Sequence, residues 1–157
     1  MANFVQGAQI RLLEYGFQVT KAAVTLPQTA TSTLFTVTGG RIVITSLMGT
    51  VSTVFGAGAV TLALGVVPSV GTANTGGIAA ATATMANREV GTHFWLPPIA
   101  GGVLLSGTNA GNAAQLLGGN AYVVSAGTIT WTTGASTTGA VSWAMTYIPL
   151  DNGASVS

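Results

Sequence analysis

Apolar and polar residues alternate with a period of two in several short segments of this chain, and turn residues separate those segments. The clearest alternation runs through 140–148, where four large residues share one face: Val141, Trp143, Met145 and Tyr147. Segment 128–132 alternates in the same way around Ile129 and Trp131. Because successive side chains of a strand point to opposite faces, these residues predict two strands whose large side chains meet in one core.

A glycine pair, Gly39-Gly40, separates two further β-rich segments at 34–38 and 41–45. Glycine adopts positive φ without steric cost, and two-residue loops of this kind close β-hairpins. The pattern therefore predicts that these two segments pair as a hairpin.

The segment after the glycine pair changes phase as it continues. Ile42 and Ile44 share one face of a strand, whereas Leu47 and Val51 share the other. A β-bulge near 45–46, or burial of both faces, would explain the change.

Additional strands are expected at 60–67, 103–106 and 122–124, whereas 71–84 and 107–119 are rich in small and polar residues and are expected to be long surface loops. Many short strands between frequent turns are typical of an all-β fold. We expect a single antiparallel β-sandwich, or a jelly-roll or barrel-like domain.

The chain divides into three expected parts: an extended N-terminal arm at 1–21, the β-sandwich domain at 22–151 and a C-terminal tail at 152–157. A short helix at 8–15 fits within the arm. An arm docks on a neighbouring subunit, but an ordinary N-terminal strand of the same sheet fits the segment equally well.

Charge is nearly absent, which changes the functional picture. No charged residue occurs between Arg41 and Arg88 or between Glu89 and Asp151, and 4% of the chain is charged where about a quarter is usual. A free monomer stays soluble through interspersed surface charge, so this chain is expected to be a structural subunit whose surface faces neighbours.

The same composition argues against several partners. The net charge is +1, and the four basic residues are scattered along the chain, so they form no basic patch that could bind phosphate backbones. No nucleic-acid partner is therefore expected. No segment reaches about 20 strongly apolar residues, so no membrane span is expected. The first residues lack the basic segment and the following apolar segment of a secretory signal peptide, which predicts synthesis in the cytoplasm without export.

Catalytic chemistry has few candidate residues. Apart from the arginines, the chain offers few acids and bases for catalysis: His93, three carboxylates, one lysine and three tyrosines. Two neighbouring donors, Glu89 and His93, fall short of a zinc site, and no Gly-x-Ser-x-Gly or phosphate-binding loop is present. We expect no enzyme activity, no catalytic residues, no metal and no cofactor.

Candidate interface residues follow from the same reasoning. Phe94-Trp95-Leu96 are three bulky residues in succession that cannot all face one core, so at least one of them is expected at a subunit interface, where aromatic residues are enriched. Arg11 and Arg41 are candidates because an isolated arginine in a neutral protein is expected to find a carboxylate or carbonyls on a partner.

Two parts of the sequence carry a family resemblance. The segment from Lys21 to Pro27 leading into 34–41, and the ending from Gly139 to Asp151, resemble small virion proteins from the structural gene block of tailed bacteriophages, of the kind that decorate or cement the capsid exterior. The resemblance implies a β-sandwich or barrel-like subunit, commonly trimeric, that is made in the host cytoplasm. In the virion it would sit on the major capsid protein and stiffen the shell.

Other functions remain open from the residues alone. A phage head-fibre or tail component would show short repeated strands, and no repeat is present. A carbohydrate-binding surface module would use Phe94, Trp95 and Tyr122 as a stacking platform. A self-assembling fibre subunit fits the low charge and high β propensity, although frequent glycine and proline oppose amyloid pairing.

Overall fold

The computed structural model describes residues 16–114 and 121–157, and in these ranges the chain forms strands but no helix. The strands are β1 (Phe17–Thr25), β2 (Thr31–Thr38), β3 (Ile42–Thr53), β4 (Leu62–Pro68), β5 (Asn74–Ala79), β6 (His93–Trp95), β7 (Leu105–Ser106), β8 (Tyr122–Val124), β9 (Gly127–Thr133), β10 (Ala140–Pro149) and β11 (Ser155–Val156).

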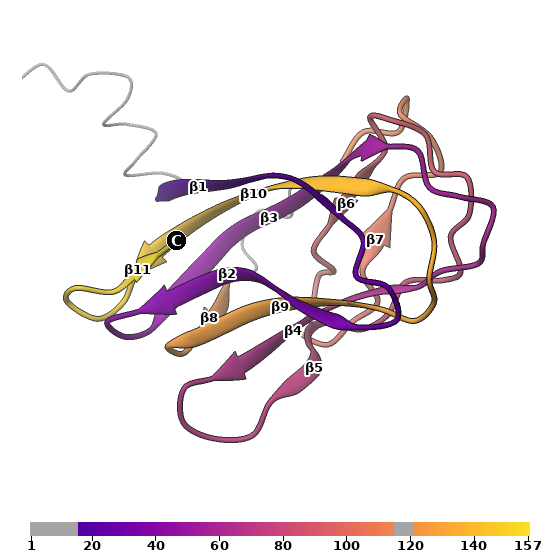
Figure 1. Ribbon diagram of the computed structural model, residues 1–157. Helices are drawn as coiled ribbons and strands as arrows, with labels where there is room; N and C mark the ends of the chain where they lie inside the picture. Colours follow the sequence, from indigo (N-terminus) through magenta and orange to yellow (C-terminus); the bar gives the residue numbers. More distant parts are fainter. Residues whose placement is uncertain (1–15, 115–120) are drawn as a thin grey trace, which may run out of the picture.

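These strands form two antiparallel sheets that pack face to face (Figure 1). Sheet A has the order β1-β10-β3-β6-β7, with β8 also paired to β3, and sheet B has the order β11-β2-β9-β4-β5. Neither sheet closes on itself within the described ranges. The fold is therefore the expected all-β sandwich and not a closed barrel.

The core lies between β10 of sheet A and β9 of sheet B, as the alternation predicted. The large residues of both strands are buried: Val141, Trp143, Met145, Tyr147, Ile129 and Trp131. Trp131 meets Trp143 edge to face across the sandwich, with ring centroids 5.8 Å apart and an interplanar angle of 84°. Aromatic pairs in this geometry add about 0.5–1.5 kcal/mol beyond the area that they bury.

The predicted bulge in β3 is confirmed at Thr45. Ser46 is opposite Thr146 and Ile44 is opposite Tyr147, so Thr45 is the extra residue on its strand. The bulge restores the phase of the alternation, because one inserted residue moves the following side chains to the other face. Residues on both sides of it consequently reach the core: Ile42, Ile44, Leu47 and Val51.

The predicted hairpin around Gly39-Gly40 is wrong. β2 belongs to sheet B and pairs with β9, whereas β3 belongs to sheet A and pairs with β10, so the glycine pair carries the chain from one sheet to the other. Both glycines do have positive φ, 74° and 144°. Each of them packs against the turn after β10, where a Cβ on Gly39 would lie 2.2 Å from the carbonyl oxygen of Gly153.

The expected boundaries of the arm and the tail also change. Residues 17–21 form the first part of β1, which pairs with β10, so the described part of the arm is a strand of sheet A. The tail at 152–157 contains β11, which pairs with β2. The expected helix at 8–15 lies outside the described residues.

Of the additional strands, β4 and β8 occupy the expected places, and β7 is shorter than expected. The expected loop at 71–84 is wrong in part, because it contains β5, which pairs with β4. Small residues hide this strand from the sequence pattern, since Gly76, Gly77 and Ala79 leave little alternation in size. The described part of the expected loop at 107–119 forms no strand.

Candidate protein interface

The outer face of sheet A is an uncharged surface. The strand register places five residues in one row across the sheet: Thr20, Ala144, Met48, Trp95 and Leu105. Two neutral rows flank it, one of Gln18, Thr146 and Ser46 and the other of Ser142, Thr50 and His93. No Asp, Glu, Lys or Arg occurs in these rows, and all of their members are at least partly exposed.

Strand β6 decides the placement of Phe94, Trp95 and Leu96. Phe94 points into the core, fully buried, and its ring stacks on Phe55 and Trp143 at centroid distances of 5.9 and 6.5 Å. Leu96 is also buried, at 8% exposure. Trp95 is the residue of the three that lies on the outer face and remains half-buried, which agrees with the expectation that they cannot all share one core.

The indole Nε1 of Trp95 is buried but has no hydrogen-bond partner among the described residues, and the same holds for Trp143. A buried N–H without a partner costs about 1–3 kcal/mol, so the core packing of β6 must hold Trp95 in place against that cost. The neighbours of Trp95 across the strands are Met48 on β3 and Leu105 on β7, which give it an apolar setting.

A second apolar row crosses the same face at the other end of β3. Ile148 of β10 is opposite Val43 of β3, which is opposite Val123 of β8. Ile148 is 39% exposed and Val123 is 62% exposed. The outer face of sheet A therefore carries two apolar rows, and the row of Gln18, Thr146 and Ser46 separates them.

Arg41 has a carboxylate partner in its own chain. Its guanidinium donates to both carboxylate oxygens of Asp151, from Nε at 3.0 Å and from Nη2 at 2.8 Å, and its backbone N–H donates to Oδ2 at 2.7 Å. These hydrogen bonds hold the pKa of Asp151 at about 2, below its usual value of 3.8. The pair ties the start of β3 to the turn after β10, and the Arg41 side chain remains 59% exposed. Arg11 lies outside the described residues.

Glu89 and His93 do not form a joint site. The Glu89 carboxylate accepts a hydrogen bond from the backbone N–H of Ala110 at 2.6 Å, whereas His93 Nδ1 lies 3.1 Å from the Thr50 hydroxyl. Among the described residues, no group of three or more His, Cys, Asp or Glu side chains could hold a metal ion.

The aromatic platform of a carbohydrate module is not assembled. Phe94 is in the core, and Tyr122 is 7% exposed with its hydroxyl donating to the Pro97 carbonyl. Trp95 therefore stands without the two rings that were expected beside it, and stacking on sugars normally uses exposed aromatic faces.

The comparisons with known proteins add no family. No protein-family model matches the chain, and no curated protein or solved structure is significantly similar to it. In the part of the chain that the structure describes, no helix has the length and apolar character needed to cross a membrane.

Proposed function

We propose that this chain is a non-enzymatic virion structural protein that binds the outer surface of a tailed-bacteriophage capsid as a homotrimer and stabilises the shell. The major capsid protein is the proposed partner. The observation that carries the proposal is the outer face of sheet A, which presents three adjacent rows of neutral side chains with Trp95 among them. The sequence resemblance of the two ends of the domain supports the same class.

An uncharged face suits permanent contact with a neighbouring protein. Aromatic residues and methionine are enriched in interfaces, whereas charged residues are depleted at interface cores. Trp95 and Met48 lie side by side on this face, and hydroxyl-bearing residues around them can exchange hydrogen bonds with water for hydrogen bonds with a partner. No ion needs to lose its hydration when such a face is buried, so binding avoids a large desolvation penalty.

Shell stabilisation then follows from mass action. A subunit that binds the assembled shell and not the dissociated capsid protein stabilises the shell by RT ln(1 + [L]/Kd) for each site. At a free concentration of 100 times Kd this amounts to about 2.7 kcal/mol per site. Many weak contributions of this size, repeated over a shell, raise its resistance to heat without any chemical step.

The test is co-sedimentation of the purified chain with capsids that lack it, at low and high salt. Because the proposed interface is neutral, binding should change little between about 50 mM and 500 mM salt, where an interface of charged patches would weaken strongly. Bound capsids should also melt at a higher temperature than bare ones. A chain that stays in the supernatant at both salt concentrations would refute the proposal.

Variants locate the binding face. Trp95→Ala and Ile148→Asp, in the two apolar rows of the outer face of sheet A, should each weaken capsid binding about tenfold or more, as for central interface residues. Thr33→Asp is the control, because Thr33 is an exposed residue of β2 in the opposite sheet. Equal loss from all three variants, or loss from Thr33→Asp alone, would place the interface elsewhere.

A further inference from the structure

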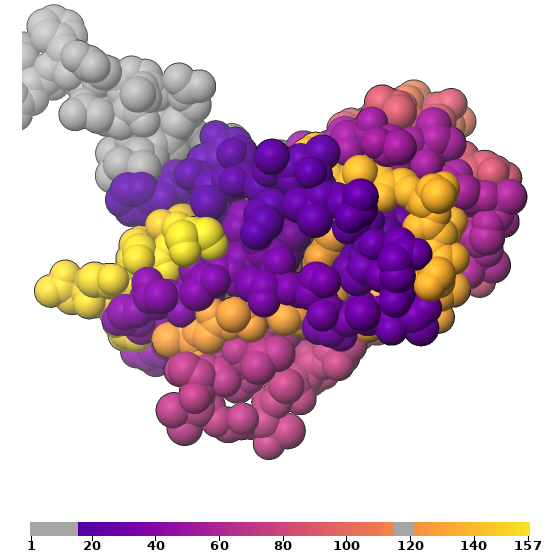
Figure 2. All heavy atoms as spheres, in the orientation of Figure 1, coloured from indigo at the N-terminus to yellow at the C-terminus, as the bar shows by residue number. Residues whose placement is uncertain are grey.

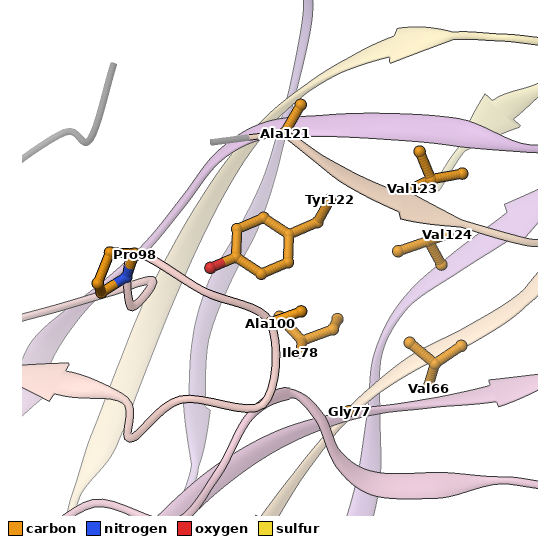
Figure 3. Close-up of a pocket in the computed structure, with 9 residues that line it drawn as sticks. All are labelled: Val66, Gly77, Ile78, Pro98, Ala100, Ala121, Tyr122, Val123 and Val124. Atoms are coloured by element: carbon orange, nitrogen blue, oxygen red, sulfur yellow. The ribbon is translucent and has the colours of Figure 1, made fainter. Parts of the chain in front are cut away.

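Few groups in the described part of the chain can react, and the cavity between β4, β5 and β8 holds no free one (Figure 3). Tyr122 is the residue of its described lining that has a polar side-chain group, and its hydroxyl donates to the Pro97 carbonyl. A reactive side chain lies instead in a surface turn, where Asn152 is followed by Gly153. This is the single Asn-Gly pair in the sequence, and asparagine loses its side-chain amide most readily when glycine follows it.

Residues 151–154 form a tight turn between β10 and β11. The Ala154 backbone N–H donates to the Asp151 carbonyl at 3.1 Å, so Asn152 and Gly153 are the two central residues of the turn. Gly153 has a φ of 85°, a conformation that glycine adopts without steric cost. Both central residues are exposed, and the turn projects from the body of the molecule, in yellow in Figures 1 and 2.

Neither of the two groups that would react is held by the rest of the described chain. The Asn152 side chain and the Gly153 backbone N–H make no hydrogen bond to a described residue, and a Cβ on Gly153 would meet no atom beyond its chain neighbours within 4 Å. Asn112 shows the contrast, because its Oδ1 accepts from the backbone N–H groups of Thr108 at 3.1 Å and Asn109 at 3.2 Å. The turn therefore leaves both the amide carbon and the attacking nitrogen of its Asn-Gly pair accessible.

The reaction that this arrangement permits is deamidation through a cyclic imide. The backbone nitrogen of Gly153 attacks Cγ of Asn152 and closes a five-membered succinimide, and the side-chain nitrogen leaves as ammonia with the proton of the attacking N–H. Water then adds to one of the two ring carbonyls and breaks its bond to the ring nitrogen. Opening at the side-chain carbonyl gives aspartate, whereas opening at the backbone carbonyl gives isoaspartate, whose main chain runs through the former side chain.

The same turn sets the position of β11, which follows it directly. Ser157 exchanges two backbone hydrogen bonds with Thr36 of β2, with N···O distances of 2.8 and 3.0 Å. A Cβ on Gly39, at the end of β2, would collide with the Gly153 carbonyl oxygen, so the turn lies tightly against that end of the strand. Among the described strands, β11 pairs with β2 alone.

We propose that Asn152 is a site of spontaneous deamidation and that its isoaspartyl product releases β11 from β2. Isoaspartate adds one carbon to the main chain of a turn that has no slack against Gly39, and two residue pairs are too few to hold β11 in register when the turn lengthens. Release leaves the backbone groups of the β2 edge unpaired and open to another strand. The aspartyl product also lowers the net charge from +1 to 0 but leaves the main chain unchanged. The proposal does not depend on the capsid role.

Ageing the purified chain at mildly alkaline pH tests the reaction. Asn152 should lose its amide at least about tenfold faster than Asn109 or Asn112, because an asparagine whose side chain is hydrogen-bonded reacts only after local opening. Peptide mass spectrometry locates the lost amide, and methylation by an isoaspartyl methyltransferase detects isoaspartate. The control Asn152→Gln, which would have to close a six-membered ring, should accumulate no isoaspartate over the same period. An intact Asn152 amide, or equal rates at the three asparagines, would overturn the proposal.

Hydrogen exchange tests the release of β11. In the isoaspartyl form, purified by ion exchange, the Thr36 and Ser157 amides should exchange about tenfold faster than in the unmodified chain, as for the loss of two backbone hydrogen bonds. Freshly prepared Asn152→Asp carries the new charge on an ordinary main chain and should keep both amides protected. The Val51 amide, which donates to the Thr92 carbonyl at 2.9 Å, should stay protected in every form. Unchanged protection of Thr36 and Ser157 in the isoaspartyl form, or an equal loss in Asn152→Asp, would refute the release.

Discussion

Gly49 lies at the centre of the core, and the substitution Gly49→Ala tests how firmly that core is packed. A Cβ at this position would lie 2.8 Å from Cζ3 and 2.9 Å from Cη2 of Trp143. The Trp143 ring has little freedom to retreat, because it meets Trp131 edge to face and stacks on Phe94. The register places Gly49 directly between Trp143 and Phe94 in neighbouring strands.

Two opposing effects set the magnitude. Forcing a methyl group into a packed core costs about 1–3 kcal/mol. Replacing glycine by alanine where the backbone permits it gains about 0.4–1 kcal/mol, because the unfolded chain loses freedom. The cost of the steric clash exceeds the gain from the unfolded chain, so Gly49→Ala should lower the free energy of unfolding by about 1–2 kcal/mol. For a chain of this size that corresponds to a decrease in Tm of about 2–8 °C.

The assay is urea unfolding followed by tryptophan fluorescence, with the midpoint expected to fall at an unchanged m value. Gly76→Ala is the matched control, because a Cβ there meets its nearest atom at an ordinary 3.5 Å. It should leave stability unchanged or raise it slightly. Trp143→Phe combined with Gly49→Ala should cost less than the sum of the two single changes. A Gly49→Ala variant as stable as the wild type would show that the Trp143 ring is free to move.

Three further predictions concern polar contacts. Asp151→Asn removes the ion pair with Arg41. Since the folded pKa of Asp151 is lowered to about 2, the stability difference from the wild type should be complete above about pH 4 and vanish as pH falls through 2, in urea titrations across that range. Tyr122→Phe leaves the Pro97 carbonyl without its donor and should cost about 1–3 kcal/mol at pH 8. Because burial raises the pKa of Tyr122, the wild type should lose that advantage above about pH 10, where the unfolded chain ionises first. Thr133→Val removes a buried hydroxyl that donates to a backbone carbonyl, and should lower stability by about 1–3 kcal/mol in thermal unfolding.

The strand positions could be read from the sequence wherever large side chains alternate. Trp131 and Trp143 mark their strands and their common core, and the phase change in β3 marks its bulge. The pairing could not be read in the same way. β2 and β3 each bury one face, and that pattern is the same whether two strands lie side by side or face each other across a core. β5 escaped prediction because its glycines carry no alternation.

The candidate interface was predictable only in part. Three bulky residues in succession correctly implied that one of them leaves the core, and the structure identifies it as Trp95. Its neighbours Met48 and Ala144 could not be assigned, because a row across a sheet joins residues far apart in the sequence. The ion pair of Arg41 could not be predicted either, because its partner Asp151 is 110 positions away and no local pattern connects the two residues.

The order of the strands also bears on how the protein is made. Within the described residues, β1 pairs with β10 alone and β2 pairs with β9 and β11, so contacts such as Thr31 to Thr132 close loops of 101 residues. A ribosome releases β1 and β2 long before their partners exist, and neither sheet can be completed until β9 and β10 have emerged. Folding is therefore expected after synthesis and at the slow end of the range for single domains. Nascent chains that stop before residue 127 should be targets for chaperones and proteases, not partly active subunits.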